Sequence, residues 1–295
     1  MSGAREDVRF PSGDTECAAW LYRPAAEGPA PLVVMGHGLG AVREMRLDAF
    51  AQRFRDAGYA VLAFDYRHFG ESGGEPRQLL DIGRQLDDWA AALHFGRRLD
   101  GIRFNRIALW GTSFAGGHVL EVAARDGMVA AVVSQCPFTD GIASLRAADP
   151  KVAARLTVRA IRDDLAALRG REPVRVPTAG APGSVALMTA PDALPGVEAL
   201  SAGKPIDHTV AARVGSRVGL YRPGRALRRP HAPTLMCICE HDSVAPASAA
   251  LAHAARGRAV ETRVYPIGHF EIYWGEWFER AVADQLEFLR RHLST

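Results

Sequence analysis

Residues 106–117 read RIALWGTSFAGG, and this stretch decides both the fold class and the candidate chemistry. The apolar run IALW is typical of a buried strand, and the segment that follows, GGHVLEVAARD, has the pattern of a helix. A strand, a tight turn with a serine at its apex and a helix form the context of a nucleophile elbow, so Ser113 is the candidate nucleophile. Gly111 fits the elbow pattern, whereas Ala115 stands where a second glycine is usual and weakens the motif.

Two further polar residues follow apolar runs near the end of the chain. Asp242 stands in EHDSVAP after the run TLMCIC, and His269 stands in IGHF after ETRVYP. Catalytic groups gather at the carboxyl ends of strands in open α/β sheets, so we expect both residues at the same sheet edge as Ser113. The order Ser, Asp, His in these contexts favours a catalytic triad. Asp140, in PFTDG after an earlier strand, is the alternative acid.

Another motif, MGHGLG at residues 35–40, ends a further predicted strand. Acyl transfer passes through a tetrahedral oxyanion, which needs preorganised N–H donors. We expect these donors to be the backbone N–H of Phe114, directly after the serine, and that of Leu39, in the loop where glycines permit close approach. His37 in the same loop is explained more simply as a structural residue than as a base.

These motifs together resemble those of a known family. HGLG, DYRHFGESGG (residues 65–74), GTSFAGG, EHDSVAP and GHF are similar to the motifs of the α/β-hydrolase superfamily, over about residues 8–138 and 231–295. The WLYRP segment resembles the opening strand of an esterase-like and Xaa-Pro-peptidase-like branch. The resemblance implies a mostly parallel eight-stranded sheet with helices on both faces and a mainly helical cap inserted after the sixth strand. It also implies chemistry that needs no metal and no cofactor.

The pattern along the chain favours the same division into core and insertion. Short apolar runs alternate with amphipathic helical segments, among them residues 43–57 and 80–99. From about residue 140 to 230 no clean strand is visible, and a stretch this long is not a plain loop. We therefore expect residues 1–140 and 231–295 to form the core and residues 141–230 to form an inserted cap.

Weaker patterns suggest which residues line a substrate pocket. The aromatic run FEIYWGEWF follows His269 and is mostly packing, but Phe270, Tyr273 and Trp274 are candidate pocket residues. In the predicted cap, the segment VALMTAPDALPG offers apolar and small side chains, and Met188 is the leading candidate there.

The charges of the chain are uneven although the net charge is only +3. No acidic residue lies between Asp207 and Glu240, a segment that holds Arg213, Arg217, Arg222, Arg225, Arg228 and Arg229. A solvated face explains this run, and the alternative is a surface that attracts an anionic or carrier-linked acyl substrate. A nucleic-acid partner is not expected, because the positive excess is small and few aromatic residues are interleaved. The oligomeric state is not predicted.

Composition limits the compartment and the chemistry further. Among 295 residues, no apolar run is long enough for a signal peptide or a membrane span, so a cytoplasmic protein is expected. The four cysteines do not form a disulfide framework in a chain of this length. Cys237 and Cys239 fit small core residues, and no partners stand at the spacing of zinc ligands.

These residues predict a serine hydrolase that cleaves a carboxylic ester or a thioester of a small-molecule acyl substrate. Ser113 forms the acyl-enzyme, His269 is the base, and Asp242 orients the imidazole. Acyl transfer and cleavage of an amide, peptide, lactone or C–C bond on the same triad stay open, since fold alone does not choose among them. A non-catalytic binding protein is the remaining alternative, and the intact set of three residues argues against it.

Overall fold

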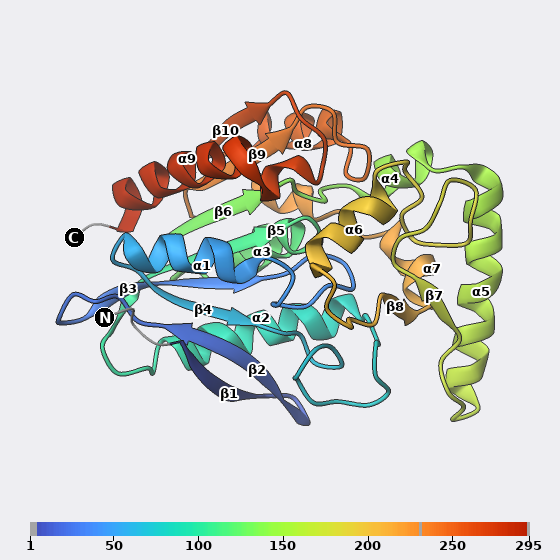
Figure 1. Cartoon of the computed structure of the whole chain (residues 1–295), viewed down its shortest axis with the longest axis horizontal. Helices are drawn as coiled ribbons and strands as arrows, with labels where there is room; N and C mark the ends of the chain where they lie inside the picture. The colour runs from blue at the N-terminus through green and yellow to red at the C-terminus, as the bar shows by residue number, and fades with distance from the viewer. Residues whose placement is uncertain (1–4, 230–231, 294–295) are drawn as a thin grey trace.

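The computed structural model describes residues 5–229 and 232–293, and its centre is an eight-stranded sheet flanked by helices (Figure 1). In chain order the strands are β1 (Glu6–Ser12), β2 (Thr15–Tyr22), β3 (Ala30–Gly36), β4 (Ala60–Phe64), β5 (Ile102–Thr112), β6 (Ala131–Gln135), β9 (Thr234–Cys239) and β10 (Val260–Tyr265). Their order in the sheet is β1-β2-β4-β3-β5-β6-β9-β10. The strand β2 runs antiparallel to both neighbours, and the other pairs are parallel. The predicted mostly parallel eight-stranded sheet is confirmed.

Helices cover both faces of the sheet, as predicted (Figure 1). One face carries α1 (Leu47–Asp56) and α9 (Gly275–Leu293), and the other carries α2 (Ile82–Gly96), α3 (Phe114–Arg125) and α8 (Ala247–Ala254). The short helix η2 (Glu271–Tyr273) precedes α9. In the described part of the chain, no helix is long and apolar enough to cross a membrane.

The first helix is shorter than the sequence pattern predicts. The apolar periodicity from residue 43 suggested a helix over residues 43–57, but α1 begins at Leu47. The reason is local, because Arg46 has a φ of 72°, in the left-handed region that a right-handed helix excludes. Residues 43–46 instead form a turn that holds Arg43 near the sheet edge.

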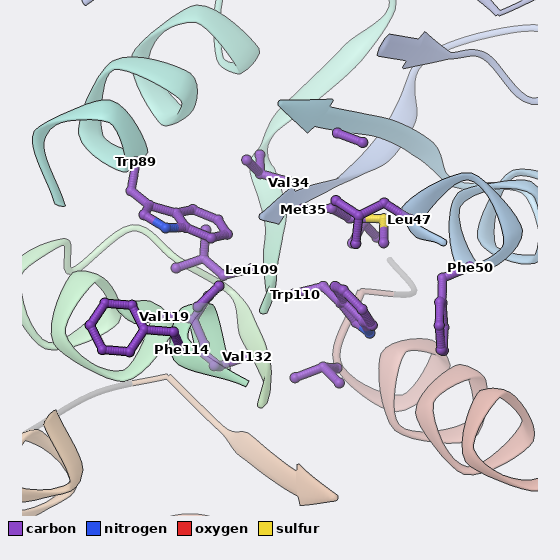
Figure 2. Packing of buried hydrophobic residues seen from close by; sticks show 14 of the residues in the cluster. Val34, Met35, Leu47, Phe50, Trp89, Leu109, Trp110, Phe114, Val119 and Val132 are labelled. Atoms are coloured by element: carbon purple, nitrogen blue, oxygen red, sulfur yellow. The ribbon is translucent and has the colours of Figure 1, made fainter. Parts of the chain in front are cut away.

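Side chains of β5 pack against helices on both faces of the sheet. Successive side chains of a strand point to opposite faces. Figure 2 shows Leu109 on the side of Trp89 from α2, and Trp110 on the side of Phe50 from α1. The Phe50 and Trp110 rings are 4.9 Å apart, and both side chains are fully buried. Burial of such a side chain contributes roughly 1.5–3 kcal/mol, so this packing stabilises β5 next to the turn at Ser113. The four cysteines are buried as free thiols: Cys17, Cys136, Cys237 and Cys239.

A mainly helical segment lies between β6 and β9. Its elements are α4 (Gly141–Ala147), α5 (Pro150–Leu168), β7 (Arg175–Pro177), α6 (Ala193–Ser201), β8 (Thr209–Ala211), α7 (Val214–Val218) and η1 (Pro223–Arg228). No clean strand is visible in the sequence of this segment, but the structure has two short ones, since β7 and β8 pair antiparallel with Val176 opposite Val210. Three-residue strands are too short to give a periodic sequence signal.

This inserted segment lies at one end of the central sheet, on the right in Figure 1, with α5 outermost. The parallel strands β5, β6 and β9 end toward it, so its elements stand over the edge where polar residues were expected. The division into a core of residues 1–140 and 231–295 and a cap of residues 141–230 stays a prediction. Residues 230 and 231 lie outside the described residues.

His118 on α3 is a buried histidine that two other elements hold. Its Nδ1 lies 2.7 Å from the Tyr221 hydroxyl, and its Nε2 lies 3.0 Å from Gln85 Oε1. The Gln85 oxygen can only accept, so Nε2 carries the proton and the Tyr221 hydroxyl donates to Nδ1. Burial lowers the pKa of His118 from 6.5 to about 3, because a charged imidazole would lose its hydration.

We expect the free energy of unfolding to fall as the pH drops below 6.5 toward 3, the two pKa values of His118 in the unfolded and folded chain. The unfolded chain binds a proton in this window that the folded chain excludes, so the stability present above it is lost on acidification. Urea unfolding at about pH 7, 6 and 5 measures this slope. In His118→Gln the slope should be smaller but not zero, since burial also lowers the pKa of His37 to about 3. An unchanged slope in the variant contradicts the assignment.

Candidate active site

Ser113 lies at a sharp turn between β5 and α3. Its backbone has a φ of 56° and a ψ of −115°, a conformation that side chains rarely adopt and that surrounding contacts must hold. The Ser113 N–H donates to Gln135 O at 2.9 Å, and the Phe138 N–H donates to Ser113 O at 2.9 Å. The turn therefore fixes Ser113 from both sides and raises its side chain above the sheet edge.

Gly111 and Ala115, the two small residues around this turn, differ in the space available for a side chain. A Cβ added at Gly111 would lie 2.2 Å from the Ala115 carbonyl oxygen, so the turn requires glycine at that position. Ala115 is fully buried, and its methyl group is accommodated in the core. The departure of Ala115 from the usual elbow pattern does not prevent the turn.

The structure brings Ser113, His269 and Asp242 together. The His269 Nε2 lies 3.1 Å from Ser113 Oγ, and the His269 Nδ1 lies 2.6 Å from Asp242 Oδ2. The other carboxylate oxygen of Asp242 accepts the backbone N–H groups of Val244 at 2.9 Å and Ala245 at 2.6 Å. The His269 and Asp242 side chains are 3% and 2% exposed, so water competes little for these bonds.

Asp140, the alternative acid, binds other partners. Its Oδ2 accepts from Arg222 Nε at 2.9 Å and Nη2 at 2.6 Å, and lies 3.2 Å from His253 Nε2. Its Oδ1 accepts the N–H groups of Ile142 and Ala143 and caps α4. The hydrogen bond to His269 Nδ1 is made by Asp242.

Phe114 and Leu39, whose backbone N–H groups are expected to form an oxyanion hole, both line the larger cavity at Ser113. Phe114 is the first residue of α3, and an N–H in the first turn of a helix has no intrahelical acceptor. Leu39 and Ser113 line the same cavities. A Cβ added at Gly38 would lie 3.1 Å from Ser113 Cβ, so the absence of a side chain at Gly38 permits this close approach.

His37 lies buried in the same loop and bonds to backbone. Its Nδ1 lies 3.1 Å from Gly38 O, and burial lowers the pKa of His37 to about 3. The imidazole is therefore neutral and donates from Nδ1 to the carbonyl. This arrangement fits the structural role predicted for His37.

A buried ion pair that the sequence pattern did not indicate fixes the loops behind the site. Arg43 is 1% exposed and pairs with Asp65, which also accepts the Arg43 N–H at 2.7 Å and the Glu71 N–H at 3.2 Å. Ser72 donates to Asp65 O at 2.7 Å and accepts the Ala18 N–H at 2.8 Å. Ser72 thus ties this loop to the backbone of β2. The sequence gives no sign that Arg43 is buried, because it stands in a segment whose pattern predicts an amphipathic helix.

Two cavities meet at Ser113. A small one, of about 40 Å³, lies against Ser113, His269, Phe270 and Tyr273. A larger one, of about 380 Å³, extends from Ser113 between α4, α5 and α7. Most residues that line the larger cavity are apolar: Leu39, Phe114, Phe138, Ile142, Leu145, Ala148, Val152, Ala153, Leu156, Ala186, Leu187, Met188, Val218, Leu220, Val244 and Ala245. This cavity can bury an apolar chain whose carbonyl carbon lies at Ser113.

The predicted pocket residues lie in different places. Met188 lines both cavities, and Phe270 and Tyr273 line the small one. The Tyr273 hydroxyl is 2.5 Å from Thr112 Oγ1, so Tyr273 also braces the end of β5. Trp274 is not among the described residues that line either cavity, and its ring packs at 5.8 Å against Tyr273. The inner face of α5 lines the larger cavity without any motif that could have indicated it.

The chain is similar in sequence to known proteins and in fold to a solved structure. The family described as alpha/beta hydrolase fold matches residues 31–182. The quorum-quenching protein AidA of Acinetobacter baumannii (strain MDR-ZJ06) is 52% identical over 286 residues, 97% of this chain and 94% of AidA. The thiohydrolase aneE of Aspergillus aculeatus (strain ATCC 16872 / CBS 172.66 / WB 5094) is 40% identical over 120 residues, 41% of this chain and 37% of aneE. The crystal structure of the alpha/beta hydrolase GrgF from Penicillium sp. sh18 matches with a TM-score of 0.84 at 24% identity, covering 99% of this chain and 100% of that chain.

Proposed function

The chain belongs to the α/β-hydrolase family, and from this premise we propose that it is a serine esterase or thioesterase with Ser113 as nucleophile. The observation that carries the proposal is the continuous hydrogen-bonded chain from Ser113 Oγ through His269 to Asp242, at 3.1 and 2.6 Å. A nucleophile, a base and an orienting carboxylate within such reach form the arrangement that activates a serine.

In the proposed mechanism, His269 Nε2 takes the proton of Ser113 Oγ as that oxygen attacks the carbonyl carbon of the substrate. Asp242 accepts the Nδ1–H of His269, which keeps the correct tautomer and stabilises the imidazolium that forms. The N–H groups of Phe114 and Leu39 stabilise the oxyanion. The leaving group departs with the proton from His269, and water then releases the acyl group by the same steps in reverse order.

The larger cavity supports an apolar acyl chain as the substrate portion bound there. Its lining offers no buried ionic partner for a charged acyl group among the described residues. Leu145 and Leu220, which line it, are 55% and 80% exposed, so the cavity opens to solvent between α4 and α7. The similarity to a protein named thiohydrolase supports including thioesters in the substrate class.

A substitution that narrows this cavity tests the acyl site. Ala153 on α5 lines the cavity, and Ala153→Phe should lower kcat/KM for a decanoyl thioester by about 10-fold or more relative to a butanoyl thioester. The reason is that the added ring takes space that only the longer chain needs. Steady-state hydrolysis of the two thioesters measures the ratio.

The adjacent residue provides a matched control. Ala154 is exposed on the outer side of α5, and Ala154→Phe should leave the decanoyl to butanoyl ratio as in the wild type. If the two variants change the ratio alike, or if Ala153→Phe lowers both substrates equally, the acyl chain does not bind in this cavity. Absence of hydrolysis of any ester or thioester by the wild type would contradict the proposed function itself.

A further inference from the structure

The arginine-rich segment divides into paired and unpaired side chains. Four of its arginines pair with carboxylates from outside the segment: Arg213 with Asp163, Arg217 with Asp164, Arg222 with Asp140 and Arg229 with Glu121. In the described part of the chain, no carboxylate forms an ion pair with Arg225 or Arg228. Ion pairing within the protein therefore explains four of these arginines but not Arg225 and Arg228.

Arg225 and Arg228 line an open cavity of about 450 Å³. It lies between η1, α8 and the start of α4, and we call it the basic cavity. Its lining consists of Arg222, Arg225, Arg228, Arg256, His253, Asp140, Ala143, Ser248, Ala249 and Ala252. Four guanidinium groups thus surround one cavity whose other side chains are mostly small. None of these residues lines the two cavities at Ser113.

The single carboxylate among the described lining residues does not neutralise this cavity. Burial alone would raise the pKa of Asp140, but hydrogen bonds from Arg222, His253 and the Ala143 N–H lower it to about 2. Both Asp140 oxygens are occupied by these donors and by the helix N–H groups. Arg225, Arg228 and Arg256 are exposed, and their guanidinium groups have no hydrogen-bond partner among the described residues.

The start of α8 also favours an anion in the basic cavity. Ser248 and Ala249 belong to the first turn of α8, which has no acidic residue and begins after Pro246 without a side-chain cap. The positive end of that helix dipole faces the same space.

We propose that the basic cavity binds the phosphate group of a phosphorylated ligand. A phosphate carries close to two negative charges and three acceptor oxygens, which matches several converging guanidinium forks better than a single carboxylate does. Binding of phosphate here does not depend on the chemistry at Ser113, so the two proposals fail separately.

The position of the basic cavity relates it to the acyl site. The N-terminal turn of α4 separates them, because Asp140 and Ala143 line the basic cavity whereas Gly141 and Ile142 line the larger cavity at Ser113. The phosphate therefore belongs either to the leaving group of an acyl thioester bound at Ser113 or to a separate phosphorylated ligand.

Titration calorimetry with inorganic pyrophosphate at low ionic strength tests the binding. We expect Arg225→Ser/Arg256→Ser to weaken binding by about 10-fold or more, since each charge-assisted contact to phosphate is strong. Arg159→Ser/Arg162→Ser removes the same charge from exposed positions on α5 and should bind as the wild type does. The single variant Arg225→Ser should weaken binding by a smaller factor. It keeps the test valid if the double variant does not fold. No binding by the wild type, or equal binding by all variants, overturns the proposal.

Two thioesters with the same acyl chain then identify the source of the phosphate. One carries a phosphorylated leaving thiol of the coenzyme A type, and the other carries N-acetylcysteamine. A rise in KM of the double variant for the phosphorylated thioester alone assigns the phosphate to the substrate and deepens the proposed function. Loss of pyrophosphate binding with the same KM ratio as the wild type assigns the cavity to a separate ligand.

Discussion

Ser113→Ala is expected to lower kcat for an acyl ester or thioester by about 10⁴- to 10⁶-fold, the range found when a serine nucleophile is removed. No other hydroxyl is held in a hydrogen bond to His269 Nε2 among the described residues, so the variant has no substitute nucleophile. Steady-state assays of wild type and variant at saturating substrate measure the ratio.

The change should leave the fold intact, because the elbow is held by backbone hydrogen bonds of residue 113 that alanine keeps. The midpoint of urea unfolding should therefore stay close to that of the wild type. Ser72→Ala is the informative control: it removes two buried hydrogen bonds and should reduce stability by about 1–3 kcal/mol while kcat changes little. A Ser113→Ala variant that keeps its activity contradicts the mechanism.

Asp242→Asn should lower kcat/KM by about 10⁴-fold. The asparagine presents either an NH₂ donor or a weaker acceptor to His269 Nδ1, so the imidazole loses its preferred tautomer and the stabilisation of its charged form. The assay is hydrolysis of the same thioester at a pH near neutrality, with unfolding measured in parallel.

Asp140→Asn is the matched control for this second prediction. Its carboxylate bonds Arg222 and His253, so the change should act on stability and alter kcat by less than about 10-fold. If Asp140→Asn proves the more damaging change for kcat, the role of orienting carboxylate has been given to the wrong residue.

The sequence indicated the fold and the candidate triad through short motifs whose context is local. RIALWGTS joins a strand to a helix within a few residues, and Asp242 and His269 directly follow apolar runs. Parallel strands place such positions at one edge, so their proximity could be inferred without knowing the packing. The structure brings these three residues into hydrogen-bond contact.

Features that depend on tertiary contacts could not be inferred in the same way. The start of α1 depends on the left-handed backbone of Arg46, and the buried pairing of Arg43 with Asp65 joins segments far apart in sequence. The strands β7 and β8 form only because a mainly helical segment folds back on itself. Whether an arginine pairs or lines a cavity, as with Arg213 and Arg225, depends on carboxylates elsewhere in the chain.

The substrate could not be predicted from the sequence, because the residues that line the acyl cavity are brought together only by the tertiary fold. The acyl cavity is lined by residues from α4, α5 and α7 that share no motif, and each is an ordinary apolar residue in sequence. The triad activates a serine toward many carbonyl compounds. The residues that line the cavity therefore determine which leaving group and which acyl acceptor are used. Met188 is a candidate from sequence because its segment is rich in apolar and small side chains, whereas the residues on the inner face of α5 give no comparable signal.

The most direct test of the central claim is labelling with a fluorophosphonate probe, followed by intact mass and peptide mapping. The wild type should gain one phosphonyl adduct on Ser113, because His269 and Asp242 activate that oxygen. The adduct should disappear in Ser113→Ala and persist in Ser72→Ala. A folded wild-type protein that remains unlabelled, or that is labelled at another serine, would contradict the assignment of Ser113 as the nucleophile.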